Sequence, residues 1–247
     1  MDRMLYIAMS AAKHTMQSQA VVANNLANIN THGFRRDLET SMHLDVVGDG
    51  AGTRSYAAIT GLGFDPSVGR FESTGNPLDV AVQGEGWLVV QGTGGRQAFT
   101  RAGNLQVDTS GTLMTASGQL VLGEGGPITL PPYDRIQIGA DGTISLRPPG
   151  APSTALVIVD RLLLVNPPTA ALEKGADGLL YARDGVPGVA PDAAVRLASG
   201  VVEGSNVNGV EQMVRQIELA RRFDMQIKMM SQAGEMEEST DTLLRAR

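Results

Sequence analysis

Glycine and proline, the residues that most often interrupt regular structure, are concentrated in the middle of this chain. All 12 prolines lie between Pro66 and Pro191, and 27 of the 30 glycines lie between Gly48 and Gly204. The two ends of the 247-residue chain can therefore form long helices, whereas the middle must turn often. This distribution predicts an α+β protein, with one helix at each end and a β-rich region between them.

The N-terminal end carries an apolar heptad pattern. Successive spacings of four and three residues predict a helix with one apolar stripe. Gly33 stands where a helix commonly ends, so we expect the helix to finish near Thr31 or His32. The stripe consists of Leu5, Met9, Ala12, Met16, Gln19, Ala23 and Leu26.

The C-terminal end has a similar stripe and predicts a second long helix. Asn206 or Asn208 can cap its start, and the pattern continues to about Leu244. Because neither helix can bury its stripe alone, we expect the two stripes to pack on each other as a coiled-coil-like pair. The second stripe consists of Val210, Met213, Ile217, Ala220, Phe223, Ile227 and Met230.

The middle of the chain has the alternation of β-strands. Strands are predicted at 78–82 and 87–89, with a turn at Gly84 and Gly86. Residues 105–114 and 136–145 share one pattern and predict two similar hairpins, and residues 156–165 predict a further strand or a buried pair of strands. The expected divisions are a helix over 1–33, an extended or adaptable segment over 34–75, a β-rich domain over 76–204 and a helix over 205–247.

Composition argues against several classes of function. A net charge of -6 does not suit a nucleic-acid partner, and the absence of cysteine excludes disulfides and cysteine metal sites. No run of 18 apolar residues predicts a membrane span, and the flanks of the apolar run at 4–12 are weak for a cleaved signal peptide.

Catalytic and ligand-binding patterns are weak throughout. Segments at Asp108 and Asp141 lack the closing glutamate of a calcium loop, and no helix follows the glycines at 84–87 as a phosphate loop requires. The three histidines lack metal-ligand spacing. We therefore expect no enzyme activity, no catalytic or metal site and no cofactor.

Three separated stretches carry a family resemblance. They read ANNLANINTHGFR from residue 23, DVAVQGEGWLVV and FTRAGNLQVDTSGTLMTASG in the middle, and EGSNVNGVEQMVRQIELARRFD from residue 203. In this order they resemble the signatures of the flagellar rod and hook protein family. Trp87 departs from the family pattern, which usually has phenylalanine there, and Gln212 stands where many members have an acidic or another polar residue.

The resemblance implies a structural role. Such proteins are exported through the flagellar type III apparatus without a cleaved signal peptide. In the periplasm they polymerise helically into a hollow basal-body shaft that transmits torque and passes exported subunits. The end helices would form the inner tube and the β-rich domain the outer layer.

Residues 1–12 and 217–230 resemble proximal rather than distal rod proteins. The implied partners are further copies of this chain, the distal rod protein FlgG, the proximal rod proteins FlgB and FlgC, and the export apparatus. A distal rod subunit and a secreted β-rich binding module are the alternative functions.

The helix pattern also suggests which residues contact other subunits. Asn24 and Asn28 share one face, away from the stripe, and side-chain amides can bond a neighbouring backbone without burying a charge. We expect this amide face and the residues of the two stripes to serve assembly. The alternative for the amides is local capping or solvation at the end of the helix.

Overall fold

The computed structural model describes residues 2–45, 55–152, 155–183 and 189–245, with side chains over 6–40, 63–152, 155–183 and 189–236. The chain forms two compact units. The helical unit comprises Met1–Ala27, Asp37–Gly63 and Asn208–Arg247, and the β unit comprises Asn28–Arg36 and Phe64–Val207.

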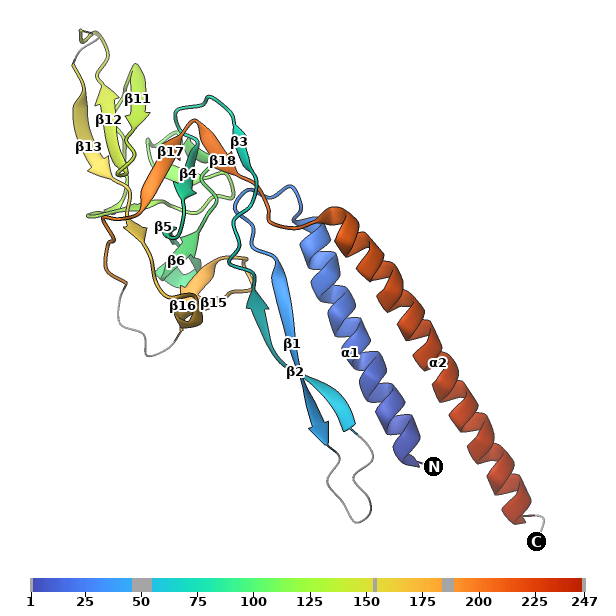
Figure 1. The fold of residues 1–247 in the computed structure, drawn as a ribbon. Helices are drawn as coiled ribbons and strands as arrows, with labels where there is room; N and C mark the ends of the chain where they lie inside the picture. Colours follow the sequence, from blue (N-terminus) through green and yellow to red (C-terminus); the bar gives the residue numbers. More distant parts are fainter. Residues whose placement is uncertain (1, 46–54, 153–154, 184–188, 246–247) are drawn as a thin grey trace. The chain divides into compact units, whose positions relative to one another are not determined.

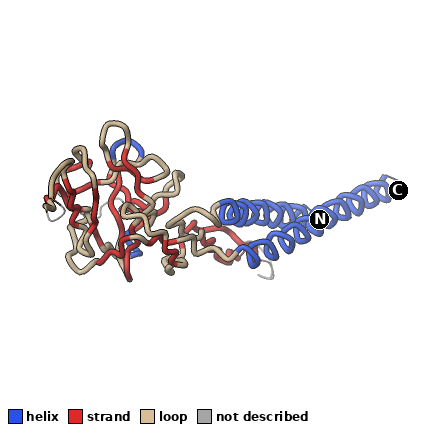
Figure 2. The backbone as a smooth tube through the Cα atoms, turned by 90° about the horizontal axis from the view of Figure 1, so that it is seen from above, coloured by secondary structure: helices blue, strands red, loops and turns tan. Residues whose placement is uncertain are grey.

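The helical unit consists of two helices and a pair of strands. Helices α1 (Asp2–Ala27) and α2 (Gly209–Arg245) lie side by side, and β1 (Asp37–Asp45) lies along α1 (Figure 1). Strand β1 pairs with β2 (Ser55–Phe64) in a two-stranded sheet. The predicted arrangement of helix, β-rich middle and helix is confirmed (Figure 2). Residues 34–75, expected as an extended or adaptable segment, include this strand pair.

The predicted end of the first helix was too late. Helix α1 ends at Ala27, and a turn follows in which the Thr31 N–H donates to the Asn28 carbonyl at 3.2 Å. Gly33 has the expected left-handed backbone, with φ of 68°. Its N–H donates to the Glu203 carbonyl at 2.7 Å rather than to the last turn of α1, so it is not the cap of that helix.

The start of the second helix matches one of the two predicted caps. The Asn208 Oδ1 accepts hydrogen bonds from the N–H groups of Val210 at 3.2 Å and Glu211 at 3.3 Å. This satisfies two of the donors that a helix leaves unpaired at its first turn. The helix then continues to Arg245, one residue beyond the predicted end.

The β unit is a set of antiparallel sheets, and every strand pair whose register the structure gives is antiparallel. The largest sheet has the strand order β14-β5-β6-β16-β15, and a second has the order β11-β12-β13. The remaining strands of this unit form two-stranded sheets. The strands are β3 (Phe71–Ser73), β4 (Val80–Gln83), β5 (Trp87–Gln91), β6 (Gln97–Thr100), β7 (Leu105–Val107), β8 (Leu113–Thr115), β9 (Leu122–Gly123), β10 (Gly126–Pro127), β11 (Arg135–Ile138), β12 (Thr143–Arg147), β13 (Val157–Arg161), β14 (Leu164–Val165), β15 (Leu172–Lys174), β16 (Leu180–Ala182), β17 (Arg196–Ser199) and β18 (Val201–Glu203).

The two repeated segments form matching hairpins, as predicted. Strands β7 and β8 pair with each other, and so do β11 and β12. Both turns place a glycine at positive φ, Gly111 at 81° and Gly142 at 85°. The Asp108 N–H donates to the Thr112 carbonyl at 2.9 Å. At the equivalent positions of the second hairpin, the Gly139 N–H donates to the Thr143 carbonyl at 2.8 Å.

Residues 156–165 form two strands, but only the second is buried. Leu164 and Val165 are 5% and 0% exposed, whereas Val157 and Ile158 on the edge strand β13 are 51% and 70% exposed. The main core of the β unit is built instead from inward-facing residues of β4, β5, β7, β8, β11 and β12, with Phe64, Trp87 and Phe99 in a second cluster.

Candidate assembly surface

Helix α1 uses small residues on the face that packs within the helical unit. Positions on this face recur every three or four residues, and none exposes more than 7% of its surface. Small side chains allow close packing, because the separation of helix axes depends on the side chains between them. The packed face consists of Ala8, Ala12, Thr15, Ser18, Val22 and Asn25.

A different side of α1 carries an exposed apolar stripe. Met9 and Met16 are 53% and 57% exposed. They lie seven residues apart, or about two helical turns, and therefore share a face. Ala20, Ala23 and Ala27 are exposed along the same line. This outer stripe of α1 comprises Met9, Met16, Ala20, Ala23 and Ala27.

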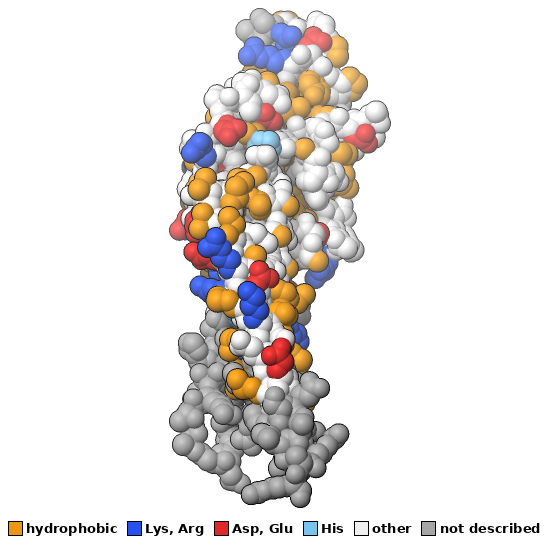
Figure 3. Space-filling view, turned by 90° about the vertical axis from the view of Figure 1, so that its right-hand side faces the viewer, with side chains coloured by type: hydrophobic (Ala, Val, Ile, Leu, Met, Phe, Trp, Pro, Cys, Tyr) orange, Lys and Arg blue, Asp and Glu red, His pale blue; other side chains and the backbone are white. Residues whose placement is uncertain are grey.

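Helix α2 has a buried face of mixed polarity and an exposed apolar face opposite it. Gln212 and Leu219 are buried, at 1% and 7% exposure. A step of two residues turns a helix by about 200°, so residues two positions apart point to nearly opposite sides. Val214 and Ile217 each lie two positions from one of these buried residues, and they are 52% and 55% exposed. Figure 3 shows apolar side chains among charged ones on the side that carries α2. The outer face of α2 comprises Val210, Met213, Val214, Ile217, Met225, Met229 and Met236.

The two helices contact each other, but not through the predicted stripes. On α1, the predicted stripe is shifted toward the outer side, so that Met9 and Met16 are exposed and Ala12 is buried. Leu26 is half-buried, and the side chain of Leu5 lies outside the described residues.

On α2, the predicted stripe turns gradually around the helix. Its mean spacing of roughly 3.3 residues falls short of 3.6, so it drifts by roughly 160° over its length. Its first members, Val210, Met213 and Ile217, are 74%, 54% and 55% exposed, and Ala220 and Ile227 are also exposed. Its other members, Phe223 and Met230, are half-buried.

Asn25 explains part of the asparagine-rich end of α1. The Asn25 Oδ1 accepts from the Asp37 N–H at 2.7 Å, and the Asn25 Nδ2 donates to the Asp37 carbonyl at 3.1 Å. One buried amide thus bonds both main-chain groups at the start of β1. Asn24 is exposed, and the Asn28 Oδ1 accepts from the Thr31 hydroxyl at 3.1 Å, which is a local bond of the capping type.

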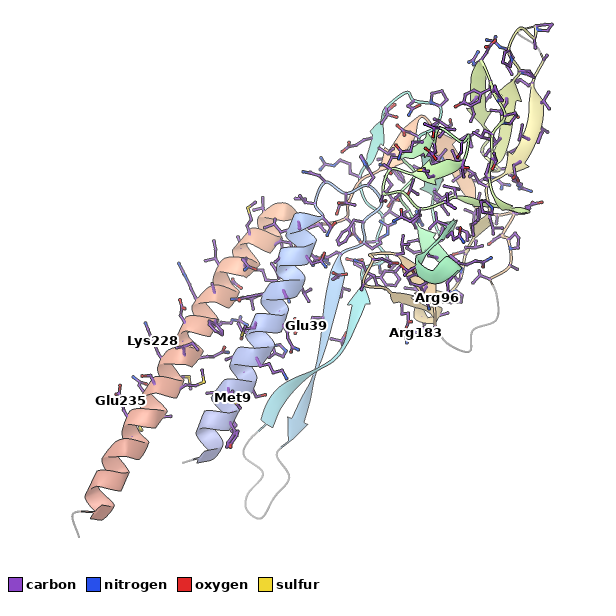
Figure 4. The ribbon with its side chains drawn as sticks, turned by 180° about the vertical axis from the view of Figure 1, so that it is seen from behind. Met9, Glu39, Arg96, Arg183, Lys228 and Glu235 are labelled. Atoms are coloured by element: carbon purple, nitrogen blue, oxygen red, sulfur yellow. The ribbon has the colours of Figure 1, made fainter. Side chains whose placement is uncertain are left out.

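A groove of about 600 Å³ runs between α1, β1 and α2 within the helical unit. Glu39 of β1 lies on its floor and points toward α1 (Figure 4). The Ser18 hydroxyl donates to the Glu39 Oε2 at 2.6 Å, and the His14 Nε2 is 3.2 Å from Oε1. The α2 wall is formed by apolar and charged residues, namely Val210, Glu211, Val214, Arg215, Glu218, Leu219 and Arg222.

The β unit contains a buried cluster of charges. The Glu203 Oε1 lies 2.7 Å from the Arg35 Nη1, and its Oε2 accepts from the Arg101 Nη1 at 3.1 Å. The guanidinium carbons of Arg35 and Arg101 lie 5.6 and 5.1 Å from the centre of the Trp87 ring, where a cation is attracted by the π electrons. Burial lowers the pKa of Arg101, and the Glu203 carboxylate opposes that shift.

Asn206, the other predicted helix cap, has a different role. Its Oδ1 accepts from the Arg36 N–H at 2.7 Å, and its Nδ2 donates to the carbonyls of Asp65 at 3.1 Å and Ser67 at 3.0 Å. Together with the charged cluster, it joins three segments at which the chain enters or leaves the β unit. Asn25, Glu39 and the charged cluster were not found from the sequence, because their partners are distant along the chain or have no periodic pattern.

Within the described residues, no group of three or more histidine, aspartate or glutamate side chains could hold a metal ion. Neither helix, over its described length, is apolar enough to cross a membrane.

Comparison with known proteins identifies the family. Residues 5–35 match the model described as "Flagella basal body rod protein", residues 81–146 match "Flagellar hook protein FlgE/F/G D1 domain", and residues 198–243 match "Flagellar basal body rod FlgEFG protein C-terminal". The chain is 43% identical to the flagellar basal-body rod protein FlgF of Salmonella typhimurium, over 99% of each chain. The chain belongs to the flagellar basal-body rod protein family.

Other rod proteins are also similar. The FlgF protein of Escherichia coli is 43% identical over 94% of each chain, and the FlgG protein of Buchnera aphidicola is 30% identical over 94% of this chain and 96% of its own. As a member of this family, the chain is a structural rod protein of the flagellar basal body, and among the rod proteins it is most like FlgF.

The charged cluster connects all three segments that match rod-family models. Arg35 lies in the first segment, Trp87 and Arg101 lie in the second, and Glu203 lies in the third. Residues separated by more than 160 positions thus meet in one buried network. The network holds the two ends of the β unit together.

Proposed function

We propose that this rod protein is a subunit of the proximal rod, and that it polymerises helically into a hollow shaft through its two end helices. The observation that carries the proposal is the exposed apolar face on each helix, which is distinct from the face packed within the chain. A surface helix normally has one apolar face, and large exposed apolar patches mark interaction sites.

The mechanical role requires repeated contacts. A shaft subunit must meet neighbours in several directions, and each neighbour must be held without covalent links. One face of each helix is used inside the helical unit, and the outer stripe of α1 and the outer face of α2 are available to neighbours. Several residues of the predicted stripes, such as Met9, Met16 and Met213, are exposed in the single chain. They are therefore available for contacts with neighbouring subunits, which supports this assignment.

In this proposal the end helices form the inner, coiled-coil-like tube and the β unit forms the outer layer. The chain is exported through the flagellar export apparatus without a cleaved signal peptide and assembles in the periplasm with further copies of itself and with FlgG, FlgB and FlgC. Its role is to transmit torque and pass exported subunits, and it has no enzymatic activity. Similarity to FlgF over nearly the whole chain supports the proximal position, and the similarity to FlgG keeps a distal position as the alternative.

The proposal is tested on the outer face of α2. In cells that lack the native protein, the double variant Met213→Glu, Ile217→Glu, at two residues that do not line the groove, should fold but fail to restore swimming or to enter purified basal bodies. Both side chains are more than half exposed, so the fold of the single chain does not depend on them. Arg221→Gln, an exposed change on the same helix, is the control and should restore swimming. Normal basal bodies that contain the double variant would refute the proposal.

The amide face of α1 is tested separately. Asn24→Ala with Asn28→Ala should leave the helix content unchanged and impair swimming if these amides contact other subunits. Normal swimming would assign them to local capping and solvation instead. Removal of residues 1–27 and 209–247 tests the alternative of a secreted β-rich binding module. Such a module would retain its binding activity without the helices, whereas a rod subunit would lose assembly.

A further inference from the structure

We propose that the groove between α1, β1 and α2 of one copy receives the outer stripe of α1 from a second copy, with Lys13 of that copy directed toward Glu39. The inference rests on the proposed helical polymer, because it names one contact between its copies. It assigns an occupant to the groove and a role to the exposed charge of Lys13.

The floor of the groove is a built polar site. The Glu39 side chain is only 6% exposed, and its Oε2 is occupied by the Ser18 hydroxyl. The Oε1 atom lies 3.2 Å from the His14 Nε2, but among the described residues no donor is aligned to form a hydrogen bond with it. A buried carboxylate oxygen without an aligned donor is incompletely satisfied, so this position favours an added cationic donor.

The charges around the groove favour the same kind of occupant. Three carboxylates line it, on Glu39, Glu211 and Glu218, against the guanidiniums of Arg215 and Arg222 and the imidazole of His14 beside Glu39. An ammonium group that entered the groove would meet three carboxylates against two guanidiniums and this imidazole. Attraction between such groups is stronger in a partly buried site than in open solvent.

The outer stripe of α1 has the matching chemistry. Lys13 is the only lysine, arginine, aspartate or glutamate between residues 6 and 27, and it is exposed. Met9 precedes it by four residues and Met16 follows it by three, so the three side chains lie on adjoining parts of one face. The methionines would contact the apolar wall formed by Val214 and Leu219.

The outer stripe of α1 is long enough to cover the α2 wall. The α2 wall extends from residue 210 to residue 222, which is about 18 Å along a helix. The outer stripe, from residue 9 to residue 27, extends about 27 Å on the same basis. Beyond Met16 the stripe continues with Ala20 and Ala23, whose small side chains allow a close approach of the incoming helix.

The chain contains no cysteine, so the contact can be tested by site-directed cross-linking. Two variants of the full chain are co-expressed in cells lacking the native copy, one with Val214→Cys and the other with Met9→Cys or Met16→Cys. The two copies carry different tags, and basal bodies are purified and oxidised. We expect a disulfide-linked dimer that contains both tags for at least one methionine position. Lys228→Cys, an exposed residue of α2 that does not line the groove, replaces Val214→Cys as the control and should give less than one-tenth as much dimer.

The outcomes separate the two proposals. Basal bodies that contain both variants without the mixed dimer, or with equal dimer for Lys228→Cys, would overturn the groove contact and leave the rod function intact. If a tagged chain without any cysteine substitution is also absent from the purified basal bodies, both the groove contact and the rod function would be overturned.

The role of Lys13 is tested by charge. Lys13→Glu should reduce incorporation of the chain into basal bodies at least tenfold, while Lys13→Arg should retain it because the positive charge remains. Both variants should show the helix content of the unmodified chain, since Lys13 is exposed. Equal incorporation of the Glu and Arg variants would refute the assignment of Lys13.

Discussion

Replacement of Asn25 by alanine should destabilise the helical unit, although alanine is the better helix former. Asn25 is 2% exposed and makes two hydrogen bonds to the main chain of Asp37, at 2.7 and 3.1 Å. The variant Asn25→Ala removes both bonds, so the Asp37 N–H and the Asp37 carbonyl each lose their side-chain partner. The neighbouring variant Asn24→Ala is the matched control, because it makes the same chemical change at an exposed position of the same helical turn.

The expected magnitude follows from opposing effects. Each lost hydrogen bond lowers the free energy of unfolding by about 1 kcal/mol, and incomplete solvation of the Asp37 main chain adds roughly another 1 kcal/mol. The higher helix propensity of alanine returns about 0.6 kcal/mol. Asn25→Ala should therefore lower the free energy of unfolding by about 2–3 kcal/mol, whereas Asn24→Ala should change it by less than about 1 kcal/mol.

The two units can be followed separately during urea unfolding. Circular dichroism at 222 nm follows the two long helices, and tryptophan fluorescence follows the β unit, because Trp87 is the only tryptophan of the chain. The Asn25→Ala variant should shift the helical transition while the fluorescence transition stays in place. Equal helical transitions for Asn25→Ala and Asn24→Ala would refute the assigned role of the buried amide.

Three changes in the β unit have equally definite outcomes. Glu203→Ala leaves the guanidiniums of Arg35 and Arg101 buried without their carboxylate. Calorimetry should show that this variant lowers the free energy of unfolding by about 3–5 kcal/mol. A loss below about 1 kcal/mol would contradict a buried ion network. Gly33→Ala places a Cβ 2.2 Å from neighbouring main-chain atoms at a φ of 68°, and should lower the free energy of unfolding by at least about 1–3 kcal/mol; an unchanged value would refute the strain. Burial raises the pKa of Asp177, but hydrogen bonds from the Tyr181 hydroxyl and a main-chain N–H outweigh it and hold the pKa below its ordinary value. The resulting stability is present above about pH 4 and is lost as the pH falls through the lowered value, so Asp177→Asn should reduce the loss of stability between pH 5 and pH 2.

The elements of the fold could be predicted because they depend on local chemistry. The confinement of glycine and proline located both helices, and the alternation of apolar residues located β4 and β5. The two repeated segments form matching hairpins because each has a glycine at the position where the turn requires positive φ, Gly111 and Gly142. Asn208 was identified as a possible cap because its amide needs only the next helical turn as a partner.

The contacts between elements could not be predicted, for reasons that differ from site to site. The packed face of α1 is built from small and polar residues such as Ala8, Ser18 and Asn25, which contribute little to an apolar pattern. The Arg35–Glu203 pair joins residues 168 positions apart, and no local rule connects them. Both residues lie in recognised family motifs, but a motif does not indicate which of its charges are buried together.

The apolar pattern of the end helices becomes consistent if the chain has two sets of surfaces to bury. Contacts inside the helical unit must place β1 at one position on α1, and directional hydrogen bonds such as those of Asn25 and Ser18 can do this. In the proposed shaft, contacts between copies must bury enough surface to hold it together, and large exposed apolar side chains such as Met16 and Ile217 would provide this at about 25 cal/mol per Å². The apolar stripes predicted from the sequence therefore include residues that the single chain leaves exposed, because large apolar side chains also mark faces that, in the proposed shaft, are buried only after assembly.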